Sequence, residues 1–148
     1  MRYGNSVRTL TSVALCTLAL AAVPAARAYD RGCSNAMLSG SYSDQDTGTI
    51  VGVGPFAGVN VDTFDGHGGL TIKGVSSVNG SVSPGTSTGT YQVNPDCTGT
   101  YRVTDTSGDT FDAFFVISDG GNELRIVITD PGTVINCIAH KQFPDRRD

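Results

Sequence analysis

The chain has 148 residues, of which 14 are acidic and 10 basic, and its formal net charge is −4. Phosphate binding needs clustered Lys and Arg, so this acidic chain is not expected to bind nucleic acid or an anionic membrane. The length allows one modest hydrophobic core and therefore a single domain.

Residues 1–28 are predicted to be a signal peptide. Arg2 and Arg8 give a basic start, and the apolar run 9–23 is too short to span a bilayer well. Ala26 and Ala28 match the small residues that signal peptidase requires, which places cleavage after Ala28. Residues 29–148 are then expected to form one secreted or periplasmic domain. Leu15 stands before Cys16, so lipid attachment is not expected, and no later segment predicts a membrane anchor.

Three cysteines remain in the predicted mature chain. An oxidising compartment favours one disulfide and leaves one thiol over. Cys33 lies near the mature N-terminus and Cys97 lies in a turn-like stretch, two places where a covalent link restrains loose chain. Cys137 lies in an apolar, strand-like run, where cysteine usually behaves as a small buried hydrophobe. We therefore predict a Cys33–Cys97 disulfide and a free Cys137.

After residue 28 the chain is predicted to be entirely β. Apolar residues recur with period two, and turn signals rich in Gly, Pro, Asn and Asp arrive about every ten residues. A glycine-rich segment, 48–58, gives no clear signal. The predicted strands are 38–46, 56–65, 69–78, 86–93, 98–105, 110–119, 122–130 and 133–142.

Eight consecutive strands with short links favour a single antiparallel up-and-down β-barrel, because closure removes the unpaired strand edges. A two-sheet β-sandwich is the alternative. Both architectures bury one face of each strand, so the turns decide which side chains point inward.

The turns predict the pairing of the later strands. A two-residue turn at Gly120-Gly121 sets Ile117 opposite Leu124 and Phe115 opposite Ile126. The face predicted to lie inside is Phe111, Ala113, Phe115, Ile117, Leu124, Ile126 and Ile128. Phe114 and Val116 then form an outward apolar patch that could meet a protein partner.

The two flanking hairpins extend this register. A three-residue loop ending at Gly108 points Tyr101 inward and sets Arg102 opposite Asp112 as an exposed ion pair. A turn around Pro131-Gly132 places Cys137 inside, together with Ile135 and Ala139, and places His140 outside, near Glu123.

Five stretches carry a family resemblance: "CSNAMLSGSY", "TFDGHGGL", "GTYQVNPDCTGTY", "FFVISDGGNELRIVITDPGTV" and "AHKQF". With them, most of Cys33 to Phe143 resembles a group of small exported bacterial proteins that look like calycin or allene-oxide-cyclase-type β-barrels. The resemblance implies a small barrel and agrees with the Cys33–Cys97 pair. It implies no activity, and Cys137 looks like an addition particular to this chain.

Catalytic and metal-binding signals are weak. "TFDGHGGL" lacks the spacing of a calcium loop, and His67 and His140 stand alone, so Asp65 to Gly69 is interpreted as a turn between strands. No G-x-S-x-G motif is present, and most acids fall in turns or at strand ends, so an inward pair of carboxylates is not expected. Asn79-Gly80-Ser81 is interpreted as a hairpin turn. No catalytic residue, metal site or cofactor is predicted.

A ligand cavity is the remaining possibility, because barrels of this class often enclose one. Tyr42, Tyr91 and Tyr101 are the candidate ligand-binding residues, since their phenols could reach the lumen. Inward Phe, Ile and Leu side chains could instead fill the lumen completely, with the tyrosines as core residues. The leading hypothesis is a non-enzymatic barrel that binds a small apolar ligand or a protein partner. The alternatives are an isomerase or cyclase and a structural, surface-associated protein.

Overall fold

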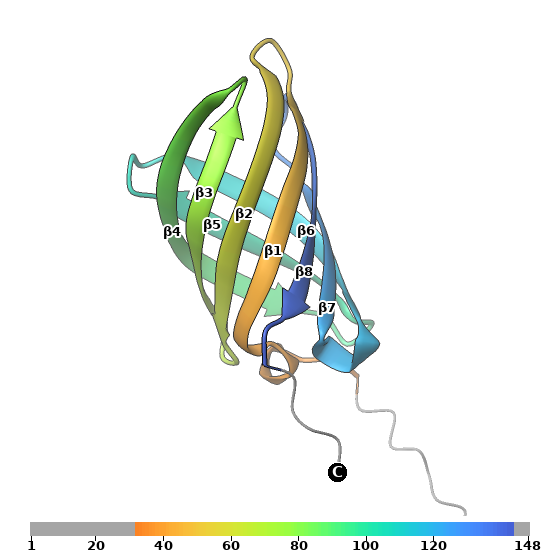
Figure 1. The fold of residues 1–148 in the computed structure, drawn as a ribbon. Helices are drawn as coiled ribbons and strands as arrows, with labels where there is room; N and C mark the ends of the chain where they lie inside the picture. The colour runs from red at the N-terminus through yellow and green to blue at the C-terminus, as the bar shows by residue number, and fades with distance from the viewer. Residues whose placement is uncertain (1–31, 144–148) are drawn as a thin grey trace, which may run out of the picture.

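A computed structural model describes residues 32–143, so the predicted signal peptide lies outside the described residues. They form a closed, eight-stranded antiparallel barrel in which each strand pairs with its neighbour in sequence (Figure 1). The all-β prediction and the up-and-down barrel are confirmed. The strands are β1 (Ser39–Ile50), β2 (Gly54–Asp65), β3 (Gly69–Val78), β4 (Ser81–Val93), β5 (Thr98–Asp105), β6 (Thr110–Ser118), β7 (Glu123–Ile128) and β8 (Thr133–Lys141).

The first and last strands close the barrel. Nine residues of β1, Tyr42 to Ile50, pair with Lys141 to Thr133 of β8, while β1 also pairs along its whole length with β2. Each strand of the described residues therefore pairs with two neighbours, which excludes the two-sheet β-sandwich alternative. Within residues 32–143, no helix is both long enough and apolar enough to cross a membrane.

The register predicted for the later strands is confirmed. Phe115 pairs with Ile126, Tyr101 pairs with Ala113, and Arg102 pairs with Asp112. The side chains predicted to lie inside are buried or partly buried, except that Phe111 is 38% exposed at the barrel end. Predicted interior positions Ile135, Cys137 and Ala139 of β8 are also buried.

The glycine-rich segment 48–58 was the least clear part of the prediction. The structure makes it the end of β1, a tight turn at residues 51–53 and the start of β2. Gly48 is required there, because a Cβ on it would collide with the backbone of Val134 and Ile135 on β8. Close approach of two strands, rather than flexibility, explains this glycine. β4 also begins at Ser81, earlier than the predicted residue 86.

The barrel has two different ends. The packed end carries the short 3₁₀ helix η1 (Asn35–Met37), and the mouth end carries the links between β1 and β2, β3 and β4, β5 and β6, and β7 and β8 (Figure 1). At the packed end Phe64 lies edge-on between Tyr42 and Tyr91, with ring centroids 5.3 and 5.0 Å away. Leu38, which follows η1, is fully buried beneath them. The packed end is therefore a filled aromatic core.

The Cys33–Cys97 disulfide is present at the packed end, as predicted. It joins the segment before η1 to the β4–β5 turn, and Cys33 N also donates a hydrogen bond to Pro95 O at 3.0 Å. The link is consistent with an oxidising, extracytoplasmic environment. Cys137 is the free cysteine among the described residues and is buried, also as predicted.

Candidate functional site

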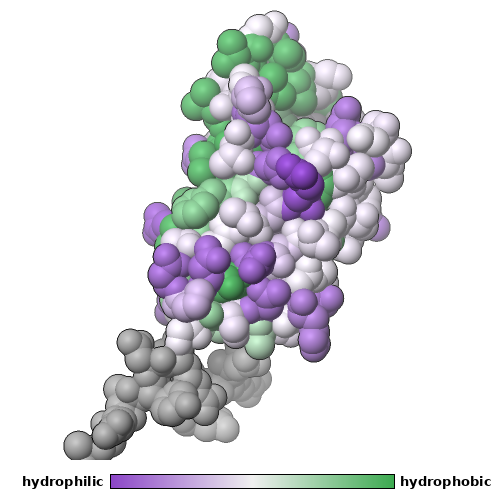
Figure 2. Space-filling model, turned by 180° about the vertical axis from the view of Figure 1, so that it is seen from behind, coloured by the Kyte–Doolittle hydropathy of each residue, from purple (hydrophilic) through white to green (hydrophobic). Residues whose placement is uncertain are grey.

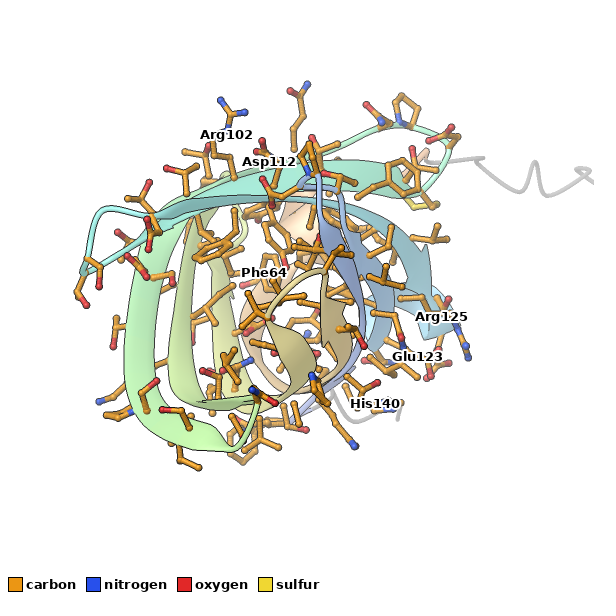
Figure 3. All side chains as sticks on the ribbon, turned by 90° about the horizontal axis from the view of Figure 1, so that it is seen from above. Phe64, Arg102, Asp112, Glu123, Arg125 and His140 are labelled. Atoms are coloured by element: carbon orange, nitrogen blue, oxygen red, sulfur yellow. A yellow bond between two sulfur atoms is a disulfide. The ribbon has the colours of Figure 1, made fainter. Side chains whose placement is uncertain are left out.

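The half of the barrel near the mouth encloses a cavity of about 230 Å³. The inward side chains therefore do not fill the lumen. Most of the cavity wall is apolar. The cavity reaches solvent at the mouth, where Phe111 on its wall remains partly exposed. Seen from the mouth, Phe64 lies near the middle of the barrel, on the axis of the lumen (Figure 3). The main apolar wall residues are Ile50, Phe56, Ile72, Val103, Ile128 and Ile135.

The deep part of the cavity is acidic. Inward positions on β1 alternate with outward ones, and they place Tyr42, Asp44 and Asp46 inside the barrel. On β2 the inward residue opposite Tyr42 is Asp62, which is fully buried. The expectation that no pair of acids points inward is therefore wrong. We call Asp44, Asp46 and Asp62, with their neighbours Asn60 and Cys137, the acidic floor.

Three strands position the acidic floor. Asn60 of β2 lies opposite Asp44, and Cys137 of β8 lies opposite Asp46. The Asn60 side-chain amide donates a hydrogen bond to Asp46 Oδ2 at 2.6 Å. Asp44 and Cys137 also form side-chain hydrogen bonds with Asp46. Asp46 is thus the shared acceptor of the floor.

Two glycines make room for these polar side chains. A Cβ on Gly58 would lie 2.7 Å from Asp46 Oδ2, and a Cβ on Gly74 would collide with Asn60 Oδ1. Each glycine lies directly across a strand pair from the side chain it accommodates. The missing side chains on the barrel wall are therefore what allows Asp46 and Asn60 to lie flat against it.

Burial dominates the electrostatics of the floor. It raises the pKa of Asp44 to about 9, with further contributions from the charges of Asp62 and Asp46. It raises the pKa of Asp62 to about 7, again with a contribution from Asp46. The pKa of the Cys137 thiol is also raised, first by burial and then by Asp46. At neutral pH Asp44 therefore keeps its proton, and Asp62 is near its midpoint.

The floor lacks compensating groups. Asp44 Oδ1 and both carboxyl oxygens of Asp62 have no hydrogen-bond partner within the described part of the chain. Among residues 32–143, no Lys, Arg or His belongs to the cavity wall. A buried carboxyl group without a partner is destabilising, and it is seldom kept in a barrel without another role.

The three predicted ligand-binding tyrosines are not brought together. Tyr42 donates its hydroxyl hydrogen to Gly121 O at 2.6 Å, and the Tyr91 hydroxyl lies 2.9 Å from Leu38 O and 3.0 Å from Asn35 O. Both hydroxyl groups therefore serve the packed end. Tyr101 alone lines the cavity, and burial, followed by the nearby Cys137 and the three acids, raises the pKa of its phenol well above the ordinary value.

"TFDGHGGL" forms the turn between β2 and β3, as predicted, and the structure places it at the packed end. Asp65 Oδ1 accepts hydrogen bonds from the backbone N–H groups of His67, Gly68 and Gly69 at 2.7–2.9 Å. The carboxylate is used by its own turn, and these hydrogen bonds lower its pKa. His67 is therefore far from the lumen chemistry and belongs to the cap of the packed core.

The floor also contains a group of potential metal ligands. One ligand atom each from Asp44, Asp46 and Cys137 lies within 4.8 Å of the other two, and all three residues are buried. This group was not predicted from the sequence, because Asp44 and Asp46 lie two residues apart in a polar strand while Cys137 lies far along the chain on β8. Carboxylate and thiolate together would suit a borderline or soft cation such as Zn²⁺.

The outer wall carries ordinary surface interactions. The Arg102 guanidinium contacts the Asp112 carboxylate through two hydrogen bonds of 2.7 and 2.6 Å, and Glu123 lies near Arg125 and His140 (Figure 3). Phe114 and Val116 are exposed, as predicted, at 39% and 40%.

Comparison of the chain with models of protein families, with curated proteins and with solved structures finds no match. The functional argument therefore depends on the lumen itself.

Proposed function

We propose that this protein is an exported, non-enzymatic binding protein that takes a small, largely apolar molecule into the mouth half of its barrel. The observation that carries the proposal is the cavity of about 230 Å³ behind an open mouth, with mainly aliphatic walls. An apolar cavity of about 150 Å³ accepts a benzene ring. The lumen is therefore large enough for one ring with a short side arm.

The surface around the mouth supports this proposal. Hydrophobic side chains gather at the mouth end of the molecule (Figure 2). Four exposed valines belong to strand ends and links there: Val51, Val53, Val82 and Val134. Such a rim favours the arrival of an apolar molecule at the opening, because exposed apolar surface marks sites of interaction.

Export is supported by the disulfide, which persists in oxidising compartments. The predicted cleavage after Ala28 would deliver the barrel to the periplasm or the medium. A ligand would then enter the lumen from the aqueous phase outside the cytoplasm.

A matched pair of variants tests the proposal. Ser87 of β4 lines the cavity, whereas its neighbour Thr88 points outward and is exposed. Ser87→Phe should fill the lumen, and Thr88→Phe adds the same ring to the outer wall. Calorimetric titration with 2-phenylethanol, a neutral apolar probe, should show binding to wild type and Thr88→Phe but not to Ser87→Phe. Equal binding by both variants would place the probe outside the lumen and overturn the proposal.

A second candidate function is proton-transfer isomerisation, in line with the isomerase or cyclase hypothesis. One observation favours it: Asp44, which is protonated at neutral pH, shares a hydrogen bond with Asp46 inside an apolar cavity beside Tyr101. Such a pair can donate and accept a proton at a bound carbonyl compound. Incubation with a β,γ-unsaturated ketone in D₂O should then produce the conjugated isomer carrying deuterium. Unchanged ketone would leave binding alone as the function.

A further inference from the structure

The cavity has two chemically different parts. Its walls toward the mouth are mainly aliphatic and aromatic, with Ser76, Ser87, Asp105 and Thr133 among them, whereas Asp44, Asp46 and Asn60 line its deep end. Asp62 is fully buried beside them and acts electrostatically on both Asp44 and Asp46. A ligand that fills the cavity from the mouth to the floor must be apolar at one end and complementary to carboxyl groups at the other.

We propose that the lumen selects an organic cation, namely a primary or secondary ammonium group attached to a small apolar body, with the ammonium on the acidic floor. This inference rests on the proposed function, because it names the class of ligand that the same cavity takes. The residues that would receive the ammonium are Asp44 and Asp46.

The hydrogen-bonding groups of the floor match an ammonium. A primary ammonium offers three N–H donors and no acceptor, whereas an ionised carboxylate offers only acceptors. Asp44 holds a proton in the empty barrel, and the positive charge of a bound ammonium would favour its loss. Asp44 lines the cavity and is only 6% exposed. Its Oδ1 atom has no hydrogen-bond partner among the described residues. Since no cationic side chain of the described part of the chain lies on the cavity wall, an incoming ammonium would supply both the missing donors and the missing positive charge.

A bare metal ion explains less of the structure. It could bind between Asp44, Asp46 and Cys137, whose ligand atoms lie within 4.8 Å of one another. However, it would need the buried Cys137 thiol to lose its proton, and burial opposes that loss. A single ion would also leave the aliphatic walls and most of the cavity of about 230 Å³ without a role. An amine with an apolar body accounts for both parts of the cavity.

The experiment compares ligands of the same shape and different charge on the full-length mature protein. The probes are 2-phenylethylamine, 2-phenylethanol and Zn²⁺ alone, titrated calorimetrically at pH 8. The amine should bind about tenfold or more tightly than the alcohol, because hydrogen bonds to an ionised partner are the stronger ones. Equal affinities, or tight binding of Zn²⁺ with no preference for the amine, would overturn the inference.

The two proposals fail in different ways. If the alcohol and the amine bind equally and Ser87→Phe abolishes both, the cavity binds ligands but the acidic floor does not select charge. If neither probe binds wild type, both the proposed function and this inference fail. The comparison needs no variant of the floor, so it does not depend on how such a variant folds.

A floor variant gives the second test. Asp44→Asn with Asp46→Asn removes both carboxyl groups while keeping their shape, and should reduce amine affinity to that of the alcohol. The matched control is Asp109→Asn, an exposed residue of the β5–β6 link at the same end of the barrel. It should keep at least half of the wild-type preference. Loss of preference in the control as well would assign the effect to overall charge and overturn the inference.

Discussion

The packed end and the mouth end of this barrel treat buried polar groups in opposite ways. At the packed end the tyrosine hydroxyl groups of Tyr42 and Tyr91 hydrogen-bond to backbone carbonyls. Toward the mouth, Asp44 and Asp62 are buried as deeply, yet carboxyl oxygens of both lack a partner. The packed end therefore stabilises the barrel, while the mouth half carries buried carboxyl groups that are destabilising unless the proposed ligand supplies their partners.

The largest expected effect comes from breaking the disulfide of the packed end. Cys97→Ser should lower the free energy of unfolding by about 4 kcal/mol, because the link closes a loop between residues 64 apart in sequence. Guanidinium denaturation would measure the loss. The control is Cys137→Ser, which removes the free thiol of the lumen and no covalent link. A Cys97→Ser protein as stable as wild type would show that the packed end does not depend on its covalent link.

The next largest effect is expected from shortening a side chain of β3, which contributes to both the packed end and the mouth half of the barrel. Leu70 and Ile72 lie two residues apart on the same face of β3, but Leu70 is 3% exposed in the packed core and Ile72 is partly buried on the cavity wall. Leu70→Ala should lower the free energy of unfolding by about 3 kcal/mol and Ile72→Ala by about 1 kcal/mol, since the second merely enlarges an existing cavity. Equal losses in urea denaturation would contradict the division into two halves.

A smaller effect is expected in how the stability of the barrel depends on pH. The folded barrel raises the pKa of Asp62 to about 7 and that of Asp44 to about 9, so it holds these protons more tightly than the unfolded chain does. The resulting stabilisation is complete below about pH 4 and is lost as the pH rises through about 7 and then about 9. Asp46, Cys137 and Tyr101 face these acids from β1, β8 and β5, and supply no positive charge to oppose the loss.

Asp62→Asn should therefore resemble wild type near pH 4, and its stability relative to wild type should rise by roughly 2–3 kcal/mol between pH 5 and pH 9. Denaturation curves at both pH values would measure the difference, with Asp109→Asn as the exposed control. The acids whose pKa values are lowered, Asp65, Asp96 and Asp112, lose their contribution in acid and do not mask this alkaline effect. A pH profile unchanged by Asp62→Asn would show that Asp62 is ionised in the folded barrel.

The smallest effect is expected on the outer wall. Arg102→Ala removes a solvent-exposed ion pair with Asp112, and such pairs are screened by water and salt. Its melting temperature should lie closer to that of wild type than for any variant above, and the difference should vanish in 1 M NaCl. A loss as large as that of Leu70→Ala would show that the exterior contributes to the packed end.

Much of the fold could be predicted because short turns set the register of the strands beside them. The hairpin at Gly120-Gly121 paired Phe115 with Ile126 correctly, since one face of these strands is wholly apolar. The acidic floor was missed because β1, "SGSYSDQDTGTI", is polar on both faces and its alternation does not distinguish inside from outside.

A weak signal for the floor was nevertheless present. Counting in twos from the buried Tyr42 reaches Asp44 and Asp46, and counting back from Phe64, beside the β2–β3 turn, reaches Asp62. The size of the cavity could not be obtained in this way, because lumen volume depends on strand tilt and stagger as well as on side-chain size.

The pairing of β1 with β8 has a consequence for how the barrel folds. Every other pairing joins neighbours in sequence, whereas this one brings together residues separated by most of the domain. Such long-range contacts are the slow ones to form. Asp46 meets Cys137 only across this seam. The enclosed lumen, and with it the proposed ligand site, is therefore complete only when β1 has paired with β8.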